Sequence, residues 1–462
     1  MEIHKSDVLP IAISANKTNA ECVLERPKRV MGGFTATMIV VASMVGTGVF
    51  TTTGILLETT PSAPAVLWAW LIGGVVAFFG ALSYAELVAM YPQNGGEYQI
   101  LSRVFHPAVG FVAGWVSLIV GFSAPIASAA MAFGKYASAG LPVIPEFGAA
   151  LTVILLLSAI HAVRVTLGTS FQNVFTILKL LLVGSFIIGG FALGDFSRLT
   201  VDSPAQTWDI MLTPGFAIGL IYVTYAYTGW NGSAYIAGEI KNPSKSLPLA
   251  LALGTAIVTL IYLGLNTVFL ISAPVETLAG SIEIGAVSAA SLFGVHTGRI
   301  FSTVIALLLV SSLSAMIMAG PRIYQSIGVD YPSFRFLTRR KGASGPFWAI
   351  ILQALISIGM ILTARFDELI TYMGFTLSIS AALTVCGVFV MRRRAPDAVR
   401  PYRCWGYPVT PILFIALSLW MIIFTFIQTP QVAFAGTATI LVGLGLYYVV
   451  RPKKQGTPNE NS

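Results

Sequence analysis

The stretch ASMVGTGVF (residues 42–50) lies inside the first long apolar run of the sequence. Two glycines around a threonine interrupt a segment that is otherwise long and apolar enough to cross a membrane as a helix. Inside a bilayer, unwound backbone is tolerated only where it is buried in protein or lines a cavity, because each N–H and C=O group needs a partner. The stretch therefore predicts a broken membrane helix. Close packing of helices through small residues is the alternative reason for its glycines.

The composition places this break in a membrane protein of many spans. Of 462 residues, 56% are hydrophobic and only 10% are charged, against about a quarter charged in soluble domains. Apolar runs of about 20 residues, the length that spans a bilayer, recur twelve times. They lie near 33–57, 66–90, 109–134, 148–163, 171–193, 213–237, 247–272, 300–320, 346–363, 368–390, 408–427 and 431–450.

Lys and Arg are distributed unevenly between the loops that join these runs. If the N-terminus is cytoplasmic, 22 of the 27 lie on cytoplasmic loops and tails and four lie on the opposite side, as the positive-inside rule expects. This bias explains the net charge of +8 without a nucleic-acid partner. We expect one transmembrane domain at 32–450, between cytoplasmic tails at 1–31 and 451–462.

A second span, around YAYTGWNG (residues 225–232), is also interrupted by glycines, five spans after the first. Interrupted spans at corresponding places indicate inverted repeats with a binding site between them. The half-helix that starts near Gly48 would present free N–H groups and its positive dipole end, which suit a carboxylate. Carbonyls near Met44 and at 225–228 would suit an ammonium group. The two breaks thus fit the head of an α-amino acid, although packing alone stays an alternative.

Five motifs in order resemble one family of membrane proteins, the amino acid-polyamine-organocation transporters, and within it the sodium-independent L-type amino-acid transporters. The resemblance runs from about Arg29 to Lys454, nearly the whole chain. The motifs are VGTGVF (45–50), YAELVAMYPQNGGEYQIL (84–101), YAYTGWN with GEIKNPSKSLP (225–231 and 238–248), AGPRIYQS (319–326) and RPYRCWGYP (400–408).

The resemblance implies an all-α polytopic fold of twelve transmembrane helices, like that of the leucine transporter. Two inverted five-helix repeats, at about 32–193 and 213–390, would be followed by two further helices at 408–450. Backbone N–H groups of the first break and its Thr hydroxyl would bind the substrate carboxylate, and carbonyls of both breaks would hold its ammonium. Tyr225 would be a lid over the substrate, with ordinary aromatic packing as the alternative. The expected substrate-binding residues are Met44, Val45, Gly46, Thr47, Gly48, Tyr225, Ala226, Tyr227, Thr228 and Asn231.

Lys179 lies eight residues into the fifth span, where an ionisable side chain is costly and suggests function. Snorkelling to the interface is the alternative, but its Cα would lie about 12 Å inside the membrane. In similar transporters a Lys in this span occupies the place of the Na⁺ of sodium-coupled relatives, and Tyr262 matches a tyrosine that joins the same network through a bound water. The resemblance therefore implies coupling and gating roles for Lys179, Tyr262 and Tyr225, and transport by sodium-independent exchange or by proton coupling.

The sequence also makes predictions about the substrate. L-type members that take bulky side chains usually have Gly where Thr228 stands, so we expect small or medium neutral amino acids. Glu86 is expected near the cytoplasmic end of span 2, reaching the interface, and no other carboxylate is expected near the pocket. This argues against polyamines, but transport of cationic amino acids or polyamines stays the alternative.

The cysteines limit which other classes of function are compatible with the sequence. Cys22, Cys386 and Cys404 are too scattered for a disulfide framework or a metal cluster, and we expect neither cofactor nor metal. The loop at 135–147 lacks the cysteine that joins similar transporters to a heavy chain, so no disulfide-linked partner is expected. An amino-acid sensor would need a signalling domain, and an intramembrane enzyme a catalytic cluster at depth. We therefore expect a permease in the bilayer of a bacterial cytoplasmic membrane, and no enzyme.

Overall fold

The computed structural model describes residues 29, 31–163, 169–200, 202–339 and 346–451, and in these ranges every regular element is a helix. The expected tails at 1–31 and 451–462 lie almost entirely outside the described residues. The elements are α1 (Gly33–Met44), α2 (Gly48–Thr59), α3 (Ala63–Met90), α4 (Gly96–Val104), α5 (Pro107–Val116), the π-helix η1 (Ser117–Ser123), α6 (Ala124–Gly140), α7 (Glu146–Val163), α8 (Thr169–Leu193), η2 (Phe196–Thr200), α9 (Pro204–Met211), α10 (Pro214–Ala226), η3 (Gly232–Glu239), α11 (Pro243–Ser272), α12 (Val275–Leu278), α13 (Ile284–Phe293), α14 (Val295–Asp330), η4 (Pro332–Thr338), α15 (Phe347–Thr363), α16 (Phe366–Arg394), α17 (Val409–Gln428) and α18 (Pro430–Val450).

Ten helical segments in the described ranges are long and apolar enough to cross a membrane, and each coincides with a predicted span. The two other predicted spans contain shorter helices. They are α10, which ends after 13 residues, and α15, which has 17. The all-α polytopic class is confirmed, whereas the number of twelve spans and the inverted repeats stay predictions.

Local sequence signals set where several helices begin. Proline occupies the first turn of α3, α5 and α10, where its missing N–H costs no hydrogen bond. The residue before each of these helices caps a free amide. Ser62 accepts from Ala65 N at 3.3 Å and Thr213 accepts from Phe216 N at 3.3 Å. Such caps satisfy amides that have no partner within the helix.

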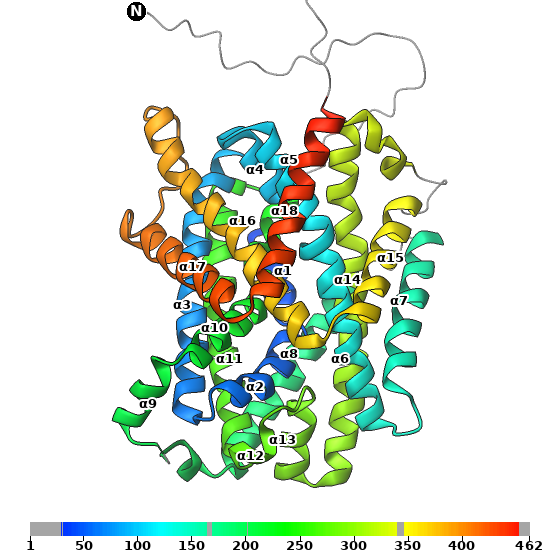
Figure 1. Cartoon of the computed structure of the whole chain (residues 1–462), viewed down its shortest axis with the longest axis vertical. Coiled ribbons are helices and arrows are strands. Elements are labelled where there is room, and N and C mark those ends of the chain that lie inside the picture. Colours follow the sequence, from blue (N-terminus) through cyan, green and yellow to red (C-terminus); the bar gives the residue numbers. More distant parts are fainter. Residues whose placement is uncertain (1–28, 30, 164–168, 201, 340–345, 452–462) are drawn as a thin grey trace, which may run out of the picture.

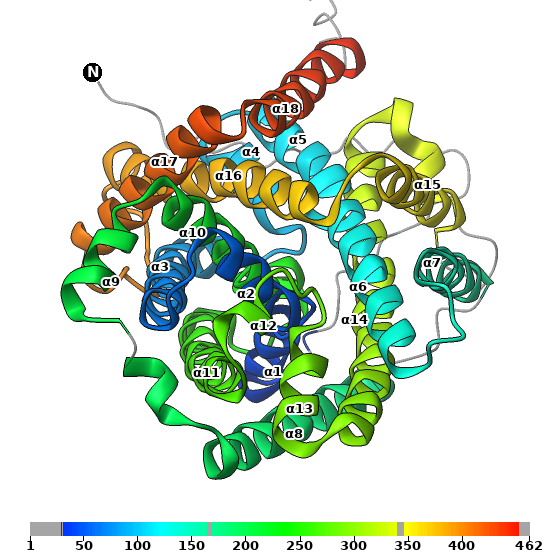
Figure 2. The same ribbon diagram turned by 60° about the horizontal axis from the view of Figure 1, so that its bottom comes forward.

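Five helical pieces, α1, α2, α3, α10 and α11, lie together and form what we call the central bundle (Figure 2). Glycines bring these helices into close contact. A Cβ on Gly74 would lie 2.4 Å from Thr259, and one on Gly254 would lie 2.7 Å from Val40. Small residues at helix contacts are how membrane helices approach closely. Helices α6 and α14 lie on one side of the bundle and α16 on another, while α17 and α18 lie at the periphery.

The molecule has two distinct ends (Figure 1). One end carries α4, the start of α5 and the C-terminal ends of α14, α16 and α18, and we call it the α4 end. The other carries α9, α12 and α13, and we call it the α13 end. Most of the described arginines lie at or near helix ends on the α4 end. Among them are Arg392, Arg393 and Arg394, in the last turn of α16. This agrees with the uneven distribution of charge predicted from the sequence.

Candidate functional site

The first break separates α1 from α2 at residues 45–47. Gly46 N turns back to donate to Met44 O at 2.7 Å, and Phe50 N donates to Thr47 O at 3.0 Å. The first amides of a helix have no intrahelical acceptor, and the positive end of the α2 dipole lies at the same place. The amides that begin α2, at Gly48 and after it, therefore lack an intrahelical acceptor, whereas the Gly46 amide is engaged with Met44 O. The binding of a carboxylate at this break stays a prediction.

The second break, residues 227–231, crosses the first at backbone contact. A Cβ added to Gly48 would lie 2.5 Å from Ala226 Cα, and one added to Gly229 would lie 2.6 Å from Ser43 O. Gly229 also has a φ of +99°, a conformation that glycine adopts without strain. Glycine at these two positions is thus what allows α1–α2 and α10–η3 to cross where both are unwound.

A cavity of about 1530 Å³ extends from the crossing to the α4 end. At the breaks it is lined by Gly46, Thr228 and Asn231, and at its mouth by Arg322 and Arg335. Its walls come from α1, α3, α6, α14 and α16. The cavity is larger than the sites of most small ligands, which are about 300–1,000 Å³. It is therefore large enough to include an access route in addition to a site for a small ligand.

Toward the α13 end, by contrast, tyrosines close the structure. The hydroxyl of Tyr225 shares hydrogen bonds with Thr47 Oγ1 at 3.1 Å and with Ser128 Oγ at 3.0 Å. Tyr136 donates to Phe50 O at 2.6 Å and accepts from Gly285 N at 3.2 Å. These bonds join α2 and α10 to α6 and to α13. The site is accordingly open at one end and closed at the other.

Lys179 is buried and points at the first break rather than at the interface. The residue is only 3% exposed. Its ammonium donates to Val45 O at 2.8 Å and to Ser312 Oγ at 2.7 Å. It thus connects the break to α14. Tyr262 reaches the same break directly, donating to Met44 O at 2.5 Å, with Ala226 O at 3.1 Å.

A match to known proteins decides what kind of molecule holds this site. The family model described as amino acid permease matches residues 31–450.

This chain belongs to the amino acid permease family.

Relatives across the length of the chain are transport proteins rather than enzymes. The permease is 28% identical to the serine/threonine exchanger SteT of Bacillus subtilis, over 92% of this chain and 98% of that one. It is 28% identical to the large neutral amino acids transporter small subunit 2 of Rattus norvegicus, over 92% and 82% of the two chains. It is 29% identical to the b(0,+)-type amino acid transporter 1 of Mus musculus, over 89% and 85%.

The carbonyls expected to hold an ammonium group are partly engaged within the permease itself. Met44 O accepts from Gly46 N and from Tyr262. Tyr225 O accepts from Thr228 N at 2.9 Å and from Thr228 Oγ1 at 2.7 Å. A carbonyl has two lone pairs, so an ammonium group at either place must displace a donor. The carbonyls accept these hydrogen bonds because the chain turns tightly at both breaks. Sequence patterns do not show such turns.

Other predicted site residues have separate tasks in the permease. Tyr227 donates to Trp70 O at 2.9 Å, and its residue is only 1% exposed. Trp70 in turn donates to Thr53 Oγ1 at 2.9 Å, and Thr53 bonds Asn266. These contacts lie within the central bundle, and Tyr227 also lines the cavity.

The permease has a buried carboxylate in its cavity that the sequence reasoning missed. Glu97, at the start of α4, lines the cavity and is 6% exposed. It accepts hydrogen bonds from Tyr84, Asn231 and Ser380. Burial raises the pKa of Glu97, and these three donors oppose the rise. The expectation that no carboxylate besides Glu86 lies near the pocket is therefore wrong. The GGEY motif that carries Glu97 was the available signal.

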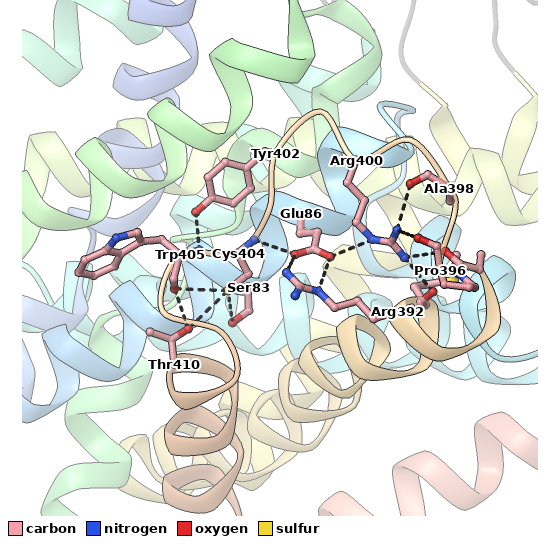
Figure 3. Close-up of polar contacts among 12 residues, drawn as sticks. Ser83, Glu86, Arg392, Pro396, Ala398, Arg400, Tyr402, Cys404, Trp405 and Thr410 are labelled. Atoms are coloured by element: carbon pink, nitrogen blue, oxygen red, sulfur yellow. Dashed lines mark hydrogen bonds and ion pairs between the residues drawn. The ribbon is translucent and has the colours of Figure 1, made fainter.

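Glu86 does not reach the interface either, because the end of α3 is covered by the chain that follows α16 (Figure 3). It is 0% exposed. Arg392 donates to it through Nε at 3.0 Å and Nη2 at 2.7 Å, and Cys404 N donates at 2.7 Å. Arg400 Nε lies 3.4 Å from Oε1. The prediction of an interfacial Glu86 is wrong, since residues more than 300 positions away cover it.

The hydroxyl of Tyr225 is the contact to test for the closed end of the permease. Tyr225→Phe removes two buried hydrogen bonds, each contributing about 0.5–1.5 kcal/mol. We expect amino-acid exchange in proteoliposomes to slow by at least about fivefold, because the closed arrangement is less populated. Ser128→Ala removes one of the two bonds and should have the smaller effect. Exchange by Tyr225→Phe at the unchanged rate would contradict this role.

Proposed function

We propose that this permease carries neutral amino acids of small or medium size across a membrane by alternating access and without sodium. The observation that carries the proposal is the crossing of two unwound segments at the head of a cavity. The amide of Gly48 and the Thr47 hydroxyl there would receive the substrate carboxylate, and the Gly46 amide would join them on leaving Met44 O. The names of its relatives support amino acids as substrates, among them serine, threonine and large neutral amino acids.

The contacts of Lys179 support independence from sodium. Na⁺ binds through oxygen atoms of carbonyl and hydroxyl groups. The two oxygens at the end of this side chain, Val45 O and Ser312 Oγ, already receive its ammonium. A fixed positive charge at this place performs the task of a bound cation, which is to hold the break against α14. We propose exchange or proton coupling in place of a sodium gradient.

The size limit rests on Thr228, which lines the cavity and folds its hydroxyl back on Tyr225 O. Thr228→Gly removes a β-branched side chain and one of the two donors to that carbonyl, because the backbone N–H of residue 228 remains. We expect the ratio of leucine to alanine uptake to rise about tenfold, within the range that one or two methyl groups discriminate in a pocket. Thr228→Val keeps the bulk without the hydroxyl and should keep the preference for alanine. An unchanged ratio in Thr228→Gly would show that another residue sets the limit.

The proposal is tested by uptake of labelled Ala, Ser, Leu, Phe and Arg into proteoliposomes. Each is measured with and without internal amino acid, with and without Na⁺, and across a pH step. Uptake of Ala and Ser that ignores Na⁺ supports the proposal. Phe taken up as fast as Ala removes the size limit, and binding without flux would make the protein a sensor.

Cationic amino acids are a second candidate substrate class, favoured by the carboxylate of Glu97 in the cavity. Uptake of Arg alone in the same experiment would establish it. We further propose that the α4 end, with its arginines, faces the cytoplasm of a bacterial cell, and that no heavy chain is attached by a disulfide. The loop at 135–147 contains no cysteine.

A further inference from the structure

The chain at the start of α4 is shaped to carry a side chain into the cavity. Gly95 and Gly96 have φ of +118° and +53°, which turn the backbone inward after α3. A Cβ on Gly96 would lie 2.5 Å from the ring of Tyr235, so this turn is pressed against η3. The next residue is Glu97, whose side chain the turn holds between α3, η3 and α16.

Three donors from three different elements surround the carboxylate of Glu97. Tyr84 of α3 and Asn231 of the second break donate to Oε1, the latter at 3.2 Å, and Ser380 of α16 donates to Oε2. All three donors are neutral. No ion pair reaches Glu97 from anywhere in the described ranges. A buried carboxylate without a cation keeps its charge only while such donors are in place.

Other ionisable groups lie near Glu97 or line the same cavity. Tyr84 and Tyr235 lie against it. Glu239, Arg322 and Arg335 line the same cavity. Arg392, at the end of α16, and Arg400, which follows that helix, form ion pairs with Glu86 and not with Glu97.

Movement of the second break changes this balance, because Asn231 belongs to it. Alternating access requires the unwound segments to move relative to the surrounding helices, and α16 and α4 are outside the central bundle. When Asn231 leaves, the carboxylate loses one of three donors and the neutral acid becomes the more stable form. When Asn231 returns, the charged form is favoured again. Protonation and conformation are therefore linked.

We propose that Glu97 carries the proton that is coupled to substrate movement in this permease. The inference rests on the proposed transport of amino acids. A proton from water forms an O–H bond at Glu97 in the conformation in which Asn231 has left. That bond breaks, with release of the proton to water in the cavity, when the arrangement described here forms. The donors Tyr84, Asn231 and Ser380 hold the resulting carboxylate.

Proteoliposomes that contain a pH-sensitive dye test the proposal with serine as the substrate. Wild-type protein should exchange labelled serine for internal serine, and without internal serine it should acidify the lumen. Glu97→Gln, which imitates the protonated acid, should retain exchange within about threefold of wild type but produce no acidification. Glu239→Gln is the matched control, because it changes another carboxylate of the same cavity, and it should acidify as wild type does.

The outcomes separate this inference from the proposed function. Acidification by Glu97→Gln at the wild-type rate, or serine exchange by the wild type without acidification in the absence of internal serine, would overturn the role of Glu97 while leaving transport intact. Absence of serine exchange in the wild type would overturn the transport of serine and the inference with it.

A second variant decides the question if Glu97→Gln does not reconstitute. Ser380→Ala keeps the carboxylate and removes one donor to its charged form, which raises the pKa of Glu97. The pH at which proton-coupled uptake is half-maximal should then rise by about one to two units. An unchanged midpoint would overturn the proposal.

Discussion

Replacing Lys179 by methionine is expected to lower amino-acid exchange by at least about 100-fold, since two hydrogen bonds from a charged group contribute about 1.5–3 kcal/mol each. Val45 O and Ser312 Oγ would lose the ammonium that joins them. The first break would then lose this connection to α14, and substrate binding would not be communicated through it between the central bundle and its surroundings. Methionine has similar length and is tolerated in a membrane helix, so the fold should persist.

The measurement is exchange of labelled substrate in proteoliposomes at equal protein content, with added Na⁺ as a second condition. Lys179→Arg is the matched control. It keeps the positive charge and donors but changes their geometry, so its loss should be smaller than that of Lys179→Met. Wild-type exchange by Lys179→Met would show that the contact is structural only.

Replacing Glu86 by alanine is expected to have the largest effect on stability. Removal of one partner from a buried ion pair costs about 3–5 kcal/mol, because the remaining charge is left uncompensated. Arg400 would be left in this state, with a side chain only 5% exposed, whereas Arg392 at 23% can reach water. Cys404 N would also lose its acceptor. We therefore expect a loss near the lower end of that range.

This loss is measured as the difference in the free energy of unfolding between wild type and variant. Unfolding of the detergent-solubilised protein is followed during titration with a denaturing detergent. Asp367→Asn is the control, because it breaks an exposed ion pair. The partner of Asp367 is Arg365, and the side chain of Arg365 is 79% exposed. Exposed pairs contribute about 0–1 kcal/mol, so this variant should unfold almost as wild type does. Equal losses in the two variants would contradict the special position of Glu86.

The parts of the site that could be predicted from sequence depend on local patterns. Two glycines around Thr47 and the glycines that follow Thr228 indicate unwound helix whatever surrounds them, and both breaks occur where they were expected. Lys179 could be placed near a break because a charge so deep in an apolar run needs a partner. Its actual acceptors, Val45 O and Ser312 Oγ, could be found only in the structure.

The parts that could not be predicted depend on residues far apart in the chain. Glu97 lies in a polar loop by sequence, and it is buried because Ser380, 283 positions later, lies against it. Glu86 has its partners 306 and 318 positions away. Tyr225 lies behind the first break, on the closed side, and does not line the cavity.

The difference between the two ends of the cavity has a consequence for inhibition. Tyr225 and Tyr136 close the α13 end, whereas the cavity at the α4 end is much larger than an amino acid. A compound with an amino-acid head and a bulky tail could therefore enter from the α4 end and inhibit transport by keeping that end open. With its tail between α1 and α14, it would prevent the return movement, and its potency would depend on the side of the membrane to which it is added.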